Sequence, residues 1–234
     1  MLGFYDYTVI LTYLSLFSAG TGIFVSLSGM GHPYWGTFFL LFCGLCDAFD
    51  GQVARTKKNR TETEKNFGIQ IDSLSDLVAF GVLPACIGMA LVRTSPLLRK
   101  LFEPGGSNVL FLVCKVTLFS IMVLYILAAL IRLAYFNVTE EERQRTEGNV
   151  RRRVFTGLPV TSAALIFPSV MLFRYILDID ISIVYFPVTL ITGLLFLSKF
   201  QIRKPGLRGI LIMIGIGLLE CILLLLFYIF FKRP

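Results

Sequence analysis

Four aspartates lie inside apolar segments that are long enough to form membrane-spanning helices: Asp47, Asp50, Asp72 and Asp76. An aspartate in a membrane helix is costly to desolvate, so it usually faces protein or water and marks a functional site. The first two are three residues apart and the last two are four apart, so each pair shares one face of an α-helix. If the two helices face each other, four carboxylates surround a common centre. Their mutual repulsion predicts bound divalent cations, because carboxylate oxygens suit Mg²⁺, Mn²⁺ or Ca²⁺.

The composition is that of a membrane protein. Apolar residues make up 56% of the 234 residues, and the mean hydropathy is +0.76. We predict an all-α, polytopic integral membrane helix bundle of about six to eight transmembrane helices, organised as one domain over residues 1–234. Within the third predicted span, Pro84 predicts a kink. The predicted spans are residues 8–28, 34–54, 68–92, 108–136, 158–177, 181–199 and 208–231.

Basic residues concentrate in three of the predicted connections, at 55–66, 139–156 and 199–208. With seven spans, these connections fall on one side of the membrane together with the N-terminus. Because loops rich in Lys and Arg are retained in the cytoplasm, we expect this side, and the aspartates near it, to face the cytoplasm. The net charge of +7 is therefore expected to serve topology and contact with anionic lipids, and we expect no nucleic-acid partner.

The aspartates belong to a longer pattern of fixed residues, Asp47-x2-Asp50-Gly51-x2-Ala54-Arg55 followed by Gly68-x3-Asp72-x3-Asp76. This pattern resembles the signature of the CDP-alcohol phosphotransferase family and matches every fixed position of it. One spacing differs, because twelve residues (56–67) separate Arg55 from Gly68 where the family signature has eight. The segment is polar, so we expect a longer surface loop that the fold tolerates.

The resemblance implies an enzyme that transfers a phosphatidyl group from a CDP-linked lipid to a small alcohol, with release of CMP. It implies two divalent cations, Mg²⁺ or Mn²⁺, with Ca²⁺ as a further candidate for a bound ion. Asp47, Asp50 and Asp72 are then expected as metal ligands. Asp76 is expected beside the second metal, and also as the general base that takes the proton of the acceptor hydroxyl. A homodimer is implied as well.

Four other signature residues are expected to bind the nucleotide and phosphates of the CDP-lipid: Gly51, Ala54, Arg55 and Gly68. Small side chains let a ligand or a neighbouring helix approach the backbone closely, and an arginine pairs with phosphate oxygens. Taken singly, such residues more often serve helix packing or snorkel to the interface. The complete signature favours ligand binding.

Three segments narrow the choice of acceptor. Residues 72–85 (DSLSDLVAFGVLPA), 132–138 (RLAYFNV) and 155–159 (FTGLP) resemble segments of bacterial and archaeal phosphatidylserine synthases. They imply CDP-diacylglycerol as donor, L-serine as acceptor and a prokaryotic cell membrane as the location. A serine carboxylate needs a cationic or multi-donor partner, and Arg132 with Asn137 is our candidate serine pocket. The runner-up is the triple arginine at 151–153, which otherwise acts as a topology signal.

Two alternatives stay open at this point. The same chemistry with glycerol 3-phosphate or an inositol phosphate as acceptor would need a second, strongly basic pocket for the acceptor's phosphate. An ion transporter also uses intramembrane carboxylates, but it has no need for small residues and an arginine in register with them. It would also be expected to show internal repeats, and the sequence shows none.

Overall fold

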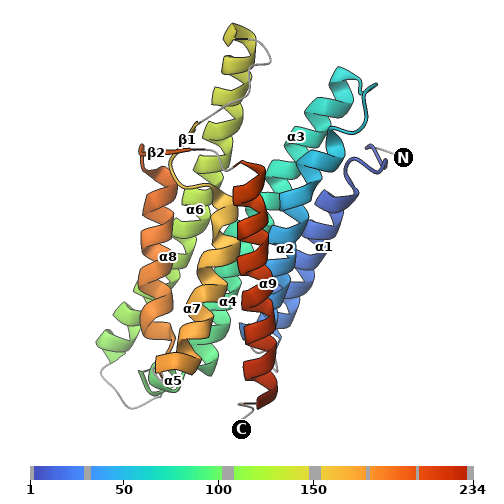
Figure 1. Cartoon of the computed structure of the whole chain (residues 1–234). Coiled ribbons are helices and arrows are strands. Elements are labelled where there is room, and N and C mark those ends of the chain that lie inside the picture. Colours follow the sequence, from blue (N-terminus) through green and yellow to red (C-terminus); the bar gives the residue numbers. More distant parts are fainter. Residues whose placement is uncertain are drawn as a thin grey trace.

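Helices packed side by side make up most of the structure, a computed structural model that describes residues 3–28, 33–101, 108–147, 154–177, 180–203 and 206–230 (Figure 1). The helices are α1 (Ile10–Leu27), α2 (Pro33–Ala54), α3 (Glu62–Asp76), α4 (Leu83–Thr94), α5 (Pro96–Leu101), α6 (Asn108–Glu147), α7 (Ala163–Leu177), α8 (Ser182–Leu197) and α9 (Leu207–Phe230). A π-helical segment, Leu77–Val82, joins α3 to α4, and a 3₁₀ turn, Val160–Ser162, precedes α7.

The predicted all-α membrane fold is confirmed. Within the described residues, five helical stretches are long and apolar enough to cross a membrane: Ile10–Leu27, Pro33–Ala54, Glu62–Thr94, Phe111–Arg143 and Arg208–Phe227. Two shorter apolar helices, Val160–Arg174 and Ser182–Leu197, match the fifth and sixth predicted spans. The third stretch contains α3, the π segment and α4 without a break, so the seven predicted spans correspond to these seven apolar stretches.

Two predicted boundaries are wrong, both where a helix continues beyond the apolar span. The third helix begins at Glu62, inside the segment predicted to be a loop. The Thr61 side chain accepts a hydrogen bond from the Glu64 amide at 3.2 Å, and the Glu64 side chain accepts one from the Thr61 amide at 2.8 Å. This reciprocal capping satisfies amides that a helix start otherwise leaves unpaired, so the polar run begins the helix six residues early.

The fourth predicted span likewise continues as helix to Glu147, through residues predicted to be a loop. Ion pairs along the helix surface join Glu140 to Arg143 at 2.6 Å and Glu141 to Arg145 at 2.5 Å. At 1.5 Å per residue, the 40 residues of α6 extend about 60 Å. A bilayer core is about 30 Å thick, so the polar end of α6 stands outside the membrane.

The irregularity predicted at Pro84 lies just before it, in the π segment. In a regular helix the Phe80 carbonyl would accept from the amide of residue 84, but proline has no N–H. The Tyr125 hydroxyl on α6 donates to the Phe80 carbonyl at 2.6 Å, and the Tyr185 hydroxyl on α8 donates to the Pro84 carbonyl at 2.7 Å. Two buried tyrosines therefore hold the π segment and the first turn of α4.

Short strands close one end of the bundle and were not predicted from the sequence. β1 (Val154–Thr156) pairs antiparallel with β2 (Gln201–Arg203). The pair lies at the end where α1 begins and where α2 connects to α3 (Figure 1). The described parts of the three basic connections therefore lie at one end together with the start of α1, as predicted, while α5 lies at the other end.

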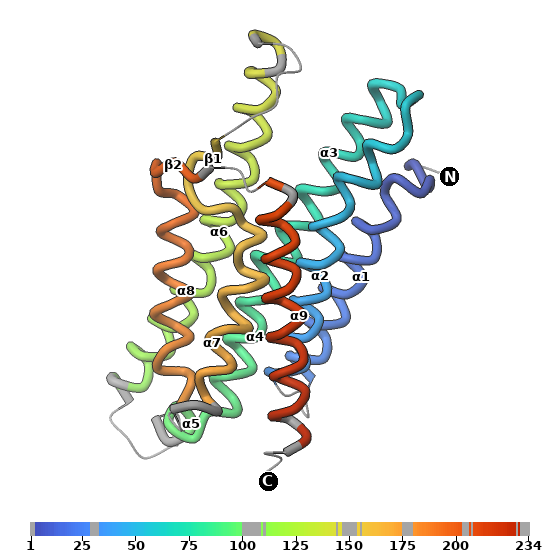
Figure 2. The backbone as a smooth tube through the Cα atoms, viewed as in Figure 1, coloured from blue at the N-terminus to red at the C-terminus, as the bar shows by residue number. Residues whose placement is uncertain are grey.

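The same backbone view shows that the start of α3 and the end of α6 rise above the neighbouring helices at this end (Figure 2). Both projecting parts are the polar helix extensions that the hydropathy pattern missed. They carry the capping residues of α3 and the ion pairs of α6. Of the carboxylates described next, Asp50 and Asp47 lie about one and two turns before the end of α2, and Asp72 lies about three turns after the start of α3.

Candidate metal and phosphotransfer site

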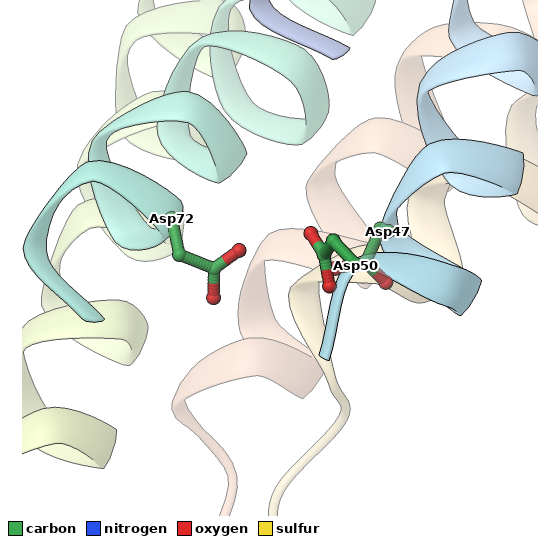
Figure 3. A group of neighbouring side chains, drawn as sticks. All are labelled: Asp47, Asp50 and Asp72. Carbon is green, nitrogen blue, oxygen red and sulfur yellow. The ribbon is translucent and has the colours of Figure 1, made fainter. Parts of the chain in front are cut away.

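Three of the four aspartates come together between α2 and α3. Asp47 and Asp50 lie near the end of α2, and Asp72 points toward them from α3 (Figure 3). One carboxylate oxygen from each of the three lies within 4.8 Å of the others. Opposite ligands of a Mg²⁺ or Ca²⁺ ion are separated by about 4–5 Å, so three hard oxygen donors at this spacing fit a single divalent ion.

Each of these three side chains is half-buried, so the group is open to a ligand while being shielded from bulk water. The spacing of three residues on α2 brings Asp47 and Asp50 to one face of the helix. Close packing of α2 on α7 orients that face, since a Cβ built on Gly44 would lie 2.5 Å from the Ala164 Cβ. Glycine at this position therefore permits a close approach of α2 and α7 directly beside the site.

Asp76 lies one helical turn farther along α3 and is more deeply buried, with 8% of its surface exposed. It is outside the group of three carboxylates whose oxygens approach one another. Its neighbour Ser75 donates a hydrogen bond to the Thr12 carbonyl of α1 at 3.2 Å, which fixes the rotation of α3 against α1. The π segment begins immediately after Asp76, and π segments inside helices frequently occur at functional sites.

The signature residues expected to bind the CDP-lipid line the same end of the α2–α3 pair. Gly51 and Ala54 lie on the last turn of α2, and the exposed Arg55 follows, with its guanidinium 3.6 Å from where a Cβ on Gly51 would lie. Gly68 lies one turn before Asp72 on α3. The space beside Gly68 was expected to be free for a ligand, but the Arg60 side chain fills it in this structure.

Ion pairs link the connection between α2 and α3 to the N-terminal segment. Lys57 forms ion pairs with Asp6 at 2.6 Å and with Glu64 at 2.9 Å. The hydrogen bond from Lys57, with that from Thr8, lowers the pKa of Asp6 to about 2. Phe4 also packs edge-on against Phe67 of α3, with ring centroids 5.3 Å apart. The contacts with Asp6 and Phe4 were not predicted from the sequence, because they join residues about 50 to 60 positions apart.

Helix α6 contacts α3 beside the carboxylates. The Asn137 side-chain amide donates to the Ser73 hydroxyl at 2.8 Å, and Ser73 follows Asp72 directly. Asn137 therefore contacts the residue that follows Asp72 on α3. Ser73 was not singled out from the sequence, and its only signal was its position inside the aspartate motif.

Arg132 is buried, with 5% of its surface exposed. Its Nε donates to the Leu158 carbonyl at 3.2 Å, and its guanidinium carbon lies 5.7 Å from the Phe136 ring centroid. This hydrogen bond therefore holds together segments 132–138 and 155–159, two of the segments that narrowed the choice of acceptor. The runner-up arginines at 151–153 lie outside the residues that the structure describes.

Comparison with known proteins gives one family and several relatives. A family model described as CDP-alcohol phosphatidyltransferase matches residues 8–219. The chain is 32% identical over 166 residues to a CDP-diacylglycerol–serine O-phosphatidyltransferase of Saccharomyces cerevisiae, covering 69% of this chain and 51% of that relative. It is 25% identical over 169 residues to a protein of the same name from Helicobacter pylori, covering 71% and 58%.

An archaetidylserine synthase of Methanothermobacter thermautotrophicus is 28% identical over 179 residues, and the match covers 76% of this chain and 64% of that relative. The matches therefore span about half to two thirds of the length of these relatives. The relatives come from yeast, a bacterium and an archaeon, so they do not restrict the source of this chain to prokaryotes.

Proposed function

Because this chain belongs to the CDP-alcohol phosphatidyltransferase family, we propose that it transfers a phosphatidyl group from CDP-diacylglycerol to L-serine. The serine hydroxyl oxygen bonds to the phosphorus that carries the diacylglycerol, the pyrophosphate bond to CMP breaks, and the products are phosphatidylserine and CMP. The observation that carries the proposal is the convergence of Asp47, Asp50 and Asp72 between α2 and α3. Three relatives named for serine-lipid synthesis support the choice of acceptor.

Members of this family use divalent metal ions, and the group of three carboxylates fits such an ion. We propose that Asp47, Asp50 and Asp72 hold metal, that Asp76 lies beside a second ion, and that the ions are Mg²⁺ or Mn²⁺. Ca²⁺ is a further candidate for a bound ion. When bound, the ions supply positive charge that stabilises the phosphate oxygens during displacement.

Asp76 is our general base. A base must reach the proton that it removes and must keep a free carboxylate oxygen, and Asp76 lies outside the group of three on the next turn of α3. Its burial shields the proton transfer from bulk water. In this assignment, Asp76 accepts the proton of the serine hydroxyl while that oxygen attacks phosphorus.

The donor's nucleotide and phosphates are assigned to the end of α2 and the facing turn of α3. The small residues Gly51, Ala54 and Gly68 let a ligand approach the helix backbone closely. The exposed guanidinium of Arg55 can form hydrogen bonds with phosphate oxygens. For serine, Asn137 is the better supported of our two residues, because its amide contacts Ser73, the residue that follows Asp72 in the motif. Arg132 remains in the proposed pocket, with its Nε held by the Leu158 carbonyl.

The end of the bundle that carries the basic connections is proposed to face the cytoplasm. Positive-inside logic supports this orientation, and it gives the site access to soluble serine. We also propose that residues 1–234 act as one membrane domain and that the protein is a homodimer, as the family resemblance implies. Location in a prokaryotic cell membrane stays a prediction.

An acceptor panel tests this function. Purified protein in detergent is given CDP-diacylglycerol and Mn²⁺ with L-serine, glycerol 3-phosphate, inositol phosphate or no acceptor, and CMP and lipid product are measured. We expect serine-dependent CMP release with phosphatidylserine as product, and none from the Asp47→Asn variant. Product from glycerol 3-phosphate but not from serine would refute the acceptor and keep the reaction class.

A further inference from the structure

Arg60 lies in the long connection between α2 and α3 and reaches back between the two helices. Its Nη2 donates to the Glu64 carbonyl of α3 at 3.2 Å, and its Nη1 donates to the Ala54 carbonyl of α2 at 3.5 Å. This connection is longer by four residues than the family signature has. Arg60 lies within this longer connection.

The guanidinium lies over the face of α3 that carries Asp72. A Cβ built on Gly68 would lie 2.7 Å from the Arg60 Nη2, so the arginine rests directly on the glycine backbone. Gly68 and Asp72 are four residues apart and share one helix face. The guanidinium therefore rests on α3 about one helical turn before Asp72, on the side of the polar end of the bundle.

The charge of Arg60 is poorly matched by what surrounds it. Its two hydrogen-bond partners are neutral backbone carbonyls, and its Nε is buried without a hydrogen-bond partner. Across the described part of the chain, Arg60 forms no ion pair, whereas Lys57 in the same connection is paired with both Asp6 and Glu64. A planar guanidinium with unused donors is suited to two parallel hydrogen bonds with a phosphate.

We propose that Arg60 binds a phosphate of the CDP-linked donor, and that the long α2–α3 connection serves to deliver it there. The inference rests on the proposed function for the identity of the donor. When the donor binds, the guanidinium of Arg60 leaves its two carbonyl partners and hydrogen-bonds to phosphate oxygens. The neighbouring carboxylate group, with its metal bound, would keep that phosphate near Arg60. Gly68 is required because any side chain there would displace the guanidinium from this position.

Binding of CDP, which carries the donor's pyrophosphate without its lipid, tests the proposal directly. The dissociation constant of CDP is measured by calorimetry at saturating Mn²⁺, and the affinity for Mn²⁺ alone is measured by electron paramagnetic resonance. Arg60→Gln should weaken CDP binding about 10- to 100-fold, as expected for lost charge-assisted hydrogen bonds. Arg60→Lys keeps the charge but not the fork, so its loss should be smaller.

The matched control is Lys58→Gln, which removes a positive charge from an exposed position two residues away and should leave CDP affinity unchanged. The affinity for Mn²⁺ should be the same in all four proteins. The inference is overturned if Arg60→Gln binds CDP as tightly as the wild type. It is equally overturned if Arg60→Gln loses CDP and Mn²⁺ affinity in parallel, because Arg60 would then only hold α2 and α3 together.

The assay contains no acceptor, so it separates this inference from the proposed function. A wild-type protein that binds CDP but forms no lipid from serine contradicts the proposed acceptor and leaves the role of Arg60 supported by its variants. A wild-type protein that does not bind CDP at all refutes the donor, and the role of Arg60 with it.

Discussion

Replacing Asp76 with asparagine should separate proton transfer from metal binding. The variant keeps the shape of the side chain and removes its basicity, and three carboxylates remain with oxygens within 4.8 Å of one another. General base catalysis contributes about 10²–10⁴-fold, so turnover at saturating Mn²⁺ should fall by that factor. This corresponds to about 2.7–5.4 kcal/mol of transition-state stabilisation.

The expected loss of metal affinity follows from distance. The Cβ atoms of Asp76 and Asp72 are one turn apart, about 6 Å, and we take the same spacing between Asp76 and the ion that the group of three would hold. At the dielectric constant of water, the attraction between a divalent cation and a carboxylate at that distance is about 1.4 kcal/mol, or tenfold in affinity. A direct ligand at about 2.3 Å contributes about 3.6 kcal/mol on the same scale, so Asp72→Asn should weaken Mn²⁺ binding by roughly 400-fold.

The assay is turnover of CDP-diacylglycerol and serine over a Mn²⁺ titration, with Mn²⁺ affinity measured separately for each variant. Glu62→Gln is the control, because it removes an exposed carboxylate from the first turn of the same helix. Recovery of wild-type turnover by Asp76→Asn at high Mn²⁺ would refute the reasoning. Asp76 would then act as a metal ligand only, and the base would have to be another residue.

Three further predictions concern the metal, the π segment and the N-terminal ion pairs. A chelator such as EDTA should abolish CMP release, and Mg²⁺ or Mn²⁺ should restore it; full activity in excess chelator would refute the metal site. Tyr125→Phe removes the hydrogen-bond donor to the Phe80 carbonyl. This change should lower the free energy of unfolding by about 1–3 kcal/mol and the melting temperature by about 2–12 °C. The control Tyr135→Phe, at a position 56% exposed on the same helix, should change the melting temperature little. Because the pKa of Asp6 is lowered from 3.8 to about 2 by Lys57, its contribution to stability is complete above about pH 4 and is lost as the pH falls through 2. Thermal melts of Lys57→Gln should lack this part of the acid dependence; identical acid profiles would contradict the pairing.

The family signature could be seen directly in the sequence. The carboxylate group could be predicted from spacing, because the spacing within one helix decides which side chains share a face. Asp47 with Asp50, and Asp72 with Asp76, were paired on this basis. The prediction that all four surround one centre went further than the structure does, because three oxygens converge and Asp76 lies one turn deeper. The metal roles of all four remain predictions.

Hydropathy decided the apolar spans, but it could not decide where helices end. The capping pair Thr61 and Glu64 and the ion pairs of α6 extend both helices into polar sequence. Such extensions depend on hydrogen bonds and charges along the helix, which an average over apolar residues does not detect.

By itself, the sequence determined the membrane setting, the number of apolar stretches and the family signature, since these depend on composition and on local spacing. Only the tertiary structure decided how Arg60 covers Gly68, how Asn137 reaches Ser73 and how Tyr125 supports the π segment beside Pro84. Two of these contacts join residues of different helices, and the third joins Arg60 in the α2–α3 connection to the helix that follows it. Their partners are set by the packing and rotation of whole helices, which no periodicity within a single segment specifies.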